Sequence, residues 1–263
     1  MHMRIPLKSL ASGALASLMF AGTAHAGVEA EAKQAASYPR VMTSNAIYKT
    51  GPLELKTCEE VPVQADDLEG VRVYLEFLLD CLNESWSKQL AKAGIPFVKP
   101  KFQVIPRIGP SACGRFPKGA QAVYCWDKRT MVVLLDKALL AEPYELDLMH
   151  VIAHEYGHHV QNLTGILPAL SRMGRKASEK VRLGHVRRVE LQAECMSGAF
   201  IGSVWHSLGR KEFDFKYIVK MAQYGDSLSH GKGKNIAHWL KKGWDAEGPQ
   251  VCNTFKAPKG LVS

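Results

Sequence analysis

Apolar residues recur at helical spacing in several segments of the chain. In residues 67–93 they fall at every third or fourth position, and Gly94 and Pro96 follow. This pattern predicts an amphipathic helix that ends where glycine and proline interrupt it. The same reasoning predicts further helices over residues 144–164, 186–208, 212–224 and 235–242.

Shorter apolar runs predict a small sheet. Residues 102–105 form one strand candidate, and residues 131–135, which read MVVLL, form a better one. Gly109-Pro110 and residues 117–119 mark turns between them. Helices dominate the predicted elements, and the sheet comes just before the helix 144–164. The sequence therefore predicts an α+β fold, mainly helical, with a small β-sheet before that helix.

The first 26 residues have the composition of an export signal. Arg4 and Lys8 precede an apolar stretch over residues 10–21, and Ala24-His25-Ala26 fits a cleavage site. We expect a signal peptide over residues 1–26, an N-terminal arm over residues 27–56 and one domain over residues 57–263. No later run is long enough for a membrane helix. The mature protein is therefore expected to be exported, periplasmic or secreted, with no transmembrane segment.

Basic residues outnumber acidic ones. The chain has 34 Lys and Arg against 25 Asp and Glu, and loss of Arg4 and Lys8 with the signal leaves 32 against 25, a net charge of +7. Many of these basic residues fall in residues 172–188, which we predict to be a connector between helices. This run is either a solvated surface or a patch that binds an anionic envelope component. No nucleic-acid-binding motif accompanies the charge, so nucleic acid is not an expected partner.

An even number of cysteines in an exported chain predicts disulfides. Six cysteines allow 15 pairings. No two of the cysteines have C-x-x-C spacing, so a cysteine zinc site is not expected. The six are Cys58, Cys81, Cys113, Cys125, Cys195 and Cys252.

The predicted helix 144–164 contains the pattern H-E-x-x-H from His154 to His158. Residues four apart on a helix share one face with Cβ atoms about 5–6 Å apart, so His154 and His158 can bind one Zn²⁺. Glu155, beside the first ligand, can act as general base on a water. The alternative is a buried helix whose histidines only satisfy hydrogen bonds.

A catalytic zinc usually has three protein ligands. Glu190 and Glu194 are four residues apart, among apolar residues that indicate a packed helix. A carboxylate on a packed helix needs a partner, and a metal ion is a suitable one. Their order favours Glu190 as the third ligand and Glu194 as the group that orients a ligand imidazole. Alternatively, both pair with Arg187 and Arg188.

The chain resembles a bacterial family, the putative neutral zinc metallopeptidases. Residues 151–161 read VIAHEYGHHVQ, similar to the family's VIAHEhGHHVQ, and residues 190–195 read ELQAEC, similar to ELQADC. Residues 113–114, 123–127 and 135–136 are similar to its C-G, F-Y-C-P-x-D and V-Y-L-D segments. Residues 229–231, 239–243 and 252–255 are similar to its T-H-G, W-F-x-x-G and C-x-T-F segments. The resemblance covers about residues 111–255.

This resemblance implies a zincin-like domain with a gluzincin-like site, in which one Zn²⁺ per chain is bound by His154, His158 and Glu190. Glu155 is implied to be the catalytic acid and base. The chain departs from the family pattern at Glu194, Trp126 and His150, where the family usually has Asp, Pro and an aromatic residue. None of these positions is a proposed ligand.

The family pattern also implies disulfide pairs. Cys113 and Cys125 flank one hairpin-like segment, and Cys195 and Cys252 fall inside two family motifs. The pairs implied are Cys58–Cys81, Cys113–Cys125 and Cys195–Cys252.

The predicted activity is hydrolysis of a peptide or protein substrate by a zinc-activated water, with Glu155 as general base. We expect the strand 131–135 to form the sheet edge that an extended substrate joins. His230, in a loop beside glycine, is the predicted donor to the oxyanion, ahead of Tyr156 and Tyr224. The alternative for His230 is a structural loop residue.

Two other functions remain open. The first is a catalytically silent cell-envelope-binding protein with a structural zinc, whose fourth ligand would be His185 or Glu194. The second is a zinc hydrolase that acts on a non-peptide amide.

Overall fold

The structure is a computed structural model that describes residues 38–58, 60–174 and 177–263. The predicted signal peptide and residues 27–37 of the predicted arm lie outside the described residues, as do Arg175 and Lys176 of the predicted basic connector. Residues Pro39–Ser263 group as one unit. No helix in the described part of the chain is long and apolar enough to cross a membrane.

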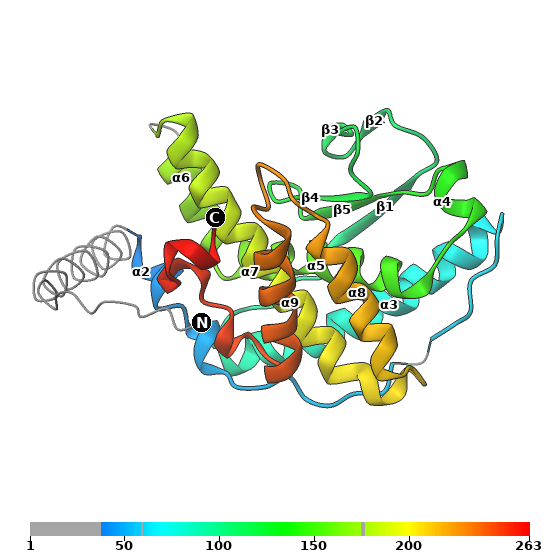
Figure 1. The fold of residues 1–263 in the computed structure, drawn as a ribbon, viewed down its shortest axis with the longest axis horizontal. Helices are drawn as coiled ribbons and strands as arrows, with labels where there is room; N and C mark the ends of the chain where they lie inside the picture. The colour runs from blue at the N-terminus through cyan, green and yellow to red at the C-terminus, as the bar shows by residue number, and fades with distance from the viewer. Residues whose placement is uncertain (1–37, 59, 175–176) are drawn as a thin grey trace, which may run out of the picture. The chain divides into compact units, whose positions relative to one another are not determined.

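Helices predominate in the described residues (Figure 1), and the predicted α+β class is confirmed. The α-helices are α2 (Arg40–Thr43), α3 (Leu68–Lys92), α4 (Lys137–Ala141), α5 (Glu145–Leu163), α6 (Ile166–Gly174), α7 (Glu179–Val204), α8 (Glu212–Gln223) and α9 (Gly233–Ala246). Single 3-10 turns occur at η1 (Ala46–Lys49), η2 (Trp205–Ser207), η3 (Pro249–Val251), η4 (Thr254–Lys256) and η5 (Lys259–Leu261). The strands are β1 (Lys101–Ile105), β2 (Pro110–Ser111), β3 (Gly114–Arg115), β4 (Ala122–Cys125) and β5 (Thr130–Leu134).

The long helices begin and end at residues that can be recognised in the sequence. The side chain of Asp67 accepts a hydrogen bond from the amide of Gly70 at 2.9 Å and caps the N-terminus of α3. Gly165, just after α5, has φ +80°, a left-handed conformation that favours glycine at a helix end. The predictions for α3, α5 and α8 agree with the structure to within two residues.

The prediction of a basic connector over residues 172–188 is wrong. Among the described residues, 172–174 end α6 and 179–188 form the first turns of α7. Ser178 caps α7 by accepting from the amide of Val181 at 3.5 Å. Lysine and arginine are good helix formers whose long side chains keep their charge in water, so a basic run does not exclude a helix.

The three-stranded sheet has the order β1-β5-β4, with β5 parallel to β1 and antiparallel to β4. The predicted substrate-binding edge, residues 131–135, is therefore wrong, because β5 is the central strand. All five residues of β5 are buried. Four of them, 131–134, are apolar, as is typical of a strand that is covered on both faces. The two edge strands are β1 and β4. The sequence of β4, AVYC, is too short for its pattern to predict a strand.

Residues 39–56, the described part of the predicted arm, pack with the rest of this unit. Met42, Ile47 and Leu53 are buried, and the amide of Leu53 donates to the carbonyl of Glu247 at 2.8 Å. The proposed boundary at residue 57 stays a prediction.

Helix α5 lies between β4, α3 and α7, and α7 in turn packs against α9 (Figure 1). Glycine allows these helices to approach closely. A Cβ on Gly157 of α5 would lie 2.9 Å from the Cα and carbonyl oxygen of Ala193 of α7. Gly198 of α7 and Gly243 of α9 meet the partner helix's backbone in the same way. The close contact brings the second half of α5 against the middle of α7.

Three disulfides join the described residues, in the pairs that the family resemblance implied. They are Cys58–Cys81, Cys113–Cys125 and Cys195–Cys252, with Cα separations of 6.0, 5.3 and 5.5 Å. The third disulfide joins α7 to the segment after α9. Its cysteine on α7, Cys195, is the residue after Glu194.

Candidate metal centre

Two imidazoles and one carboxylate converge where α5 faces α7. His154 and His158 lie on one side of α5, with ring centroids 4.9 Å apart. Glu190 of α7 places its Oε2 atom 3.3 Å from Nε2 of His154 and 3.1 Å from Nε2 of His158. The structure therefore brings together the three residues that the sequence proposed as ligands.

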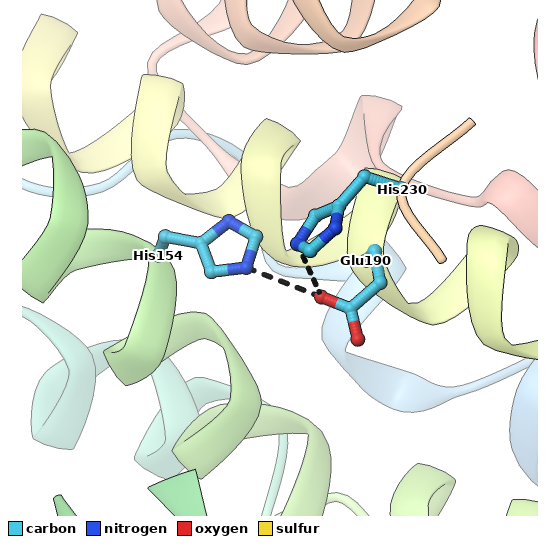
Figure 2. Close-up of side chains that lie close together, drawn as sticks. All are labelled: His154, Glu190 and His230. Carbon is cyan, nitrogen blue, oxygen red and sulfur yellow. Dashed lines mark hydrogen bonds and ion pairs between the residues drawn. The ribbon is translucent and has the colours of Figure 1, made fainter. Parts of the chain in front are cut away.

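A third imidazole reaches the same oxygen from the loop after α8. Nε2 of His230 lies 3.2 Å from Oε2 of Glu190, as Figure 2 shows. Ser227 and Gly231 form an isolated β-bridge that closes this loop, and the hydroxyl oxygen of Ser229 lies 3.0 Å from Nδ1 of His230. His230 is thus held against Glu190, although its side chain remains 41% exposed.

One set of potential ligands is compact enough to hold a metal ion. In the described residues, ligand atoms of His154, Glu190 and His230 all lie within 4.8 Å of one another. His158 is outside this set, although it contacts the same Glu190 oxygen. The candidate centre thus contains the three predicted ligands and His230, which the sequence argument placed in the site as an oxyanion donor and which the structure also brings into contact with Glu190.

The other nitrogen of each α5 imidazole contacts a side-chain oxygen. Nδ1 of His154 lies 3.0 Å from Oε2 of Glu194, whose Oε1 lies 2.7 Å from Nε2 of His150. Nδ1 of His158 lies 2.9 Å from Oε1 of Gln161. Acceptors in these positions favour a proton on Nδ1 and leave Nε2 free to bind a metal. Glu194 thus lies beside His154, where the orienting role proposed from the sequence requires it, and Gln161 lies beside His158 in the same way.

Burial and charge oppose each other in this centre. Burial raises the pKa of Glu190, but the charge of His158 and hydrogen bonds from the facing imidazoles outweigh it and hold that pKa well below its usual range. Burial also raises the pKa of Glu194, and the contacts with His150 and His154 more than reverse this. Both carboxylates are therefore anionic and enclosed. Buried anions of this kind need positive charge close to them.

A zinc ion fits this requirement. Imidazole nitrogen and carboxylate oxygen are typical zinc ligands, and each α5 imidazole already has an oriented second nitrogen. His154, His158 and Glu190 would hold the ion, and His230 lies within reach of it. Glu190 and Glu194 contact imidazoles. Arg187 donates to the carbonyl of Leu228, and Arg188 donates to those of Thr254 and Ala257.

Glu155 lies at the wall of the cavity that contains this centre. The cavity has a volume of about 690 Å³ and is lined by Glu155, His154, Glu194, His230 and residues 118–122, among others. Burial raises the pKa of Glu155, and the charges of His158 and His154 partly offset this rise. A carboxylate with a raised pKa beside a metal centre is suited to accept and return a proton.

Several alternatives from the sequence lie elsewhere. The hydroxyl of Tyr156 donates to Oδ1 of Asn83 at 2.8 Å within the core. Tyr224 is exposed and does not line the cavity. His185 lines a different cavity with Trp126 and Leu170. Oε1 of Glu194 contacts Nε2 of His150 and Oε2 contacts Nδ1 of His154, so neither oxygen is bonded to the Nε2 atoms of His154 and His158 that face Glu190.

Comparison with known proteins identifies the class. A family described as "Putative neutral zinc metallopeptidase" matches residues 59–223, more than half of the chain. The chain belongs to this family. His154, Glu155, His158, Glu190 and Glu194 lie inside the match, and His230 lies beyond its end.

The chain is also similar to individual curated proteins. It is 27% identical over 202 residues to "Uncharacterized protein YpfJ" of Escherichia coli strain K12, and this match covers 69% of this chain and 70% of that protein. It is 29% identical over 133 residues to "Uncharacterized protein Rv2575" of Mycobacterium tuberculosis strain H37Rv, which covers 41% of this chain and 44% of that protein. No solved structure matches the chain.

Proposed function

We propose that the protein is an exported zinc-dependent peptidase in which Glu155 is the general base. The observation that carries the proposal is the contact of Nε2 of His154 and His158 with one oxygen of Glu190, at 3.3 and 3.1 Å. Glu194 and Gln161 hold the opposite nitrogens of the two imidazoles. Bound zinc supplies Lewis-acid activation of a water and of the scissile carbonyl.

The protein's own residues then perform the proton transfers. Glu155 accepts a proton from the attacking water and delivers it to the leaving amine. Its burial and raised pKa support both steps, because a carboxylate with a pKa closer to neutrality is a stronger base toward the water and can still return the proton to the more basic amine. His230, which lines the same cavity from a half-exposed loop, donates to the oxyanion of the tetrahedral intermediate.

The edge of the sheet is suited to hold an extended substrate. Strand β4 pairs with β5 on one side only, and residues 118–122 line the cavity beside His154 and Glu155. A peptide that adds to this edge would be held by main-chain hydrogen bonds above α5. This assigns to β4 the role that the sequence argument gave to residues 131–135.

Export rests on the predicted signal over residues 1–26 and on the disulfides. Disulfides persist in oxidising compartments, and the three in this chain support a periplasmic or secreted location.

The competing function is a catalytically silent envelope-binding protein with a structural zinc. The observation that favours it is the contact of His230 with Glu190, because four ligands would close the site. The exposed loop that carries His230 favours the enzyme, since a ligand on such a loop can leave the metal when substrate enters.

The test combines metal analysis with a casein or peptide-library assay on the mature protein. We expect one zinc per chain and cleavage that disappears in Glu155→Gln while zinc is retained. Glu76→Gln, an equal change on the exposed face of α3, is the matched control and should keep activity. One zinc per chain without Glu155-dependent cleavage would favour the silent protein, and cleavage of non-peptide amides alone would favour the other hydrolase.

A further inference from the structure

The cavity at the metal centre adjoins a second cavity along α5. This second cavity has a volume of about 460 Å³ and is lined by Tyr144, Asp147 and Leu148 from the start of α5, among others. Val151 and residues 119–121 line both cavities. The two cavities therefore lie next to each other along α5.

Asp147 shares the face of α5 that carries the metal centre. It precedes His154 by seven residues, or two helical turns, which corresponds to about 10 Å along the axis. An extended peptide advances about 3.3 Å per residue. Asp147 is thus about three substrate residues away from the bond that lies at the metal centre.

The second cavity is acidic in a chain that is basic. The charged side chains that line it are Asp136, Glu142 and Asp147. Within the described residues, none of the three forms an ion pair, and their ligand atoms do not converge closely enough to form a metal site. Lys118 lines the first cavity only. Arg210, near Tyr144, is already paired with Glu60 and Glu145.

One oxygen of Asp147 is held in place and the other is available. The hydroxyl of Tyr217 on α8 donates to Oδ2 of Asp147 at 3.3 Å, and the Tyr217 ring packs edge-on against Tyr144, with centroids 5.5 Å apart. No hydrogen bond to Oδ1 occurs among the described residues. Burial raises the pKa of Asp147, which indicates that its negative charge is poorly solvated.

We propose that Asp147 determines substrate specificity by binding a lysine or arginine side chain of the peptide, about three residues from the scissile bond. This inference rests on the proposed function. A long basic side chain suits the cavity because its aliphatic stem can pack on Leu139, Tyr144 and Val151 while its charge reaches Oδ1 of Asp147. Asp136 and Glu142 add negative potential around the same position.

The test uses the zinc-loaded full protein and pairs of peptides that differ only in lysine against norleucine, which has the same stem without the charge. The pairs place this difference at each of three positions on either side of the cleaved bond. We expect kcat/KM to favour lysine at one position by about tenfold or more. Asp147→Asn should bring this ratio close to one. Asp127→Asn, an equal change at an exposed site outside both cavities, should keep it.

Other variants and a binding assay make the outcome decisive. Glu142→Gln, at an exposed position of the same cavity, should reduce the ratio less than Asp147→Asn, and it replaces that variant if Asp147→Asn does not fold. A lysine preference that is absent in the wild type, or that persists in both variants, would overturn the inference while leaving the peptidase function intact. If no peptide is cleaved, fluorescence anisotropy of the same peptides tests the inference separately. Preferential binding of lysine that depends on Asp147 would support it, and equal binding would overturn it.

Discussion

Oε1 of Gln161 lies 2.9 Å from Nδ1 of His158, one turn further along the same helix. The amide nitrogen of Gln161 donates to the carbonyl of Val189 at 2.8 Å and to Oε1 of Gln192 at 3.1 Å. Because both acceptors bind the nitrogen end, the oxygen end must face His158. Gln161 therefore fixes the proton of His158 on Nδ1 and directs Nε2 toward Glu190.

Replacement of Gln161 by leucine should weaken zinc binding by about 10- to 100-fold, because the imidazole loses the group that orients it. The measurement is the zinc dissociation constant, obtained by competition with a chelator. Gln89→Leu is the matched control, since Gln89 is also buried and donates to Thr50 and Gly51 far from α7. It should lower stability and leave zinc affinity unchanged. Equal affinities of the Gln161 variant and the wild type would remove the orienting role.

A second prediction concerns the contact between α5 and α7 at Gly157. A Cβ there would meet the backbone of Ala193 at 2.9 Å, so Gly157→Ala must push the two helices apart. We expect a loss of about 1–3 kcal/mol in the free energy of unfolding and weaker zinc binding, because Glu190 moves with α7. Denaturant unfolding and chelator competition measure the two effects.

Gly184→Ala is the matched control for this change. Gly184 also lies in a helix, and no atom lies within 4 Å of the Cβ it would gain. Alanine there should stabilise the protein by about 0.5–1 kcal/mol and leave zinc affinity unchanged. A Gly157→Ala variant as stable as the wild type would show that the helices accommodate the methyl group.

The core of the metal centre could be predicted because its residues are set by helical spacing. His154 and His158, and likewise Glu190 and Glu194, are four residues apart, and each pair shares a helix face regardless of the rest of the fold. The contact of His230 with Glu190 could not be found in this way, because it depends on the path of the loop after α8. Gln161 stands three residues after His158 on the same helix, but only tertiary contacts with Val189 and Gln192 fix the orientation of its amide.

The fold shows the same division between local and long-range information. Asp67 and the glycine after residue 93 define α3 locally, and the prediction holds. The central position of β5 depends on pairing with β1 and β4, although its four consecutive apolar residues are typical of a strand buried on both faces. Strand β4 was missed because Ala122–Cys125 is an apolar run of only four residues, too short to identify a strand by its pattern, and its pairing with β5 defines it.

A third prediction separates the roles of two disulfides. The Cys195–Cys252 bond has a sequence separation of 57 and the Cys113–Cys125 bond one of 12, for which chain entropy gives stabilisations of about 4 and about 3 kcal/mol. Both alanine double variants should therefore unfold at lower denaturant concentration. Only the Cys195/Cys252 variant should also bind zinc more weakly, because Cys195 follows Glu194 on α7. Equal zinc affinities of the two variants would show that α7 is held by its packing alone.

The last prediction distinguishes two roles for His230. If His230 donates to the oxyanion, His230→Ala should lower kcat by about 10²- to 10³-fold and leave zinc content and affinity intact. If His230 is instead a permanent fourth ligand, the same variant should bind zinc more weakly. Ser229→Ala, which removes the hydroxyl 3.0 Å from Nδ1 of His230, is the matched control and should have a smaller effect on kcat. Unchanged kcat in His230→Ala would exclude the catalytic role and leave Glu155 as the only residue of the chain assigned to the chemical steps.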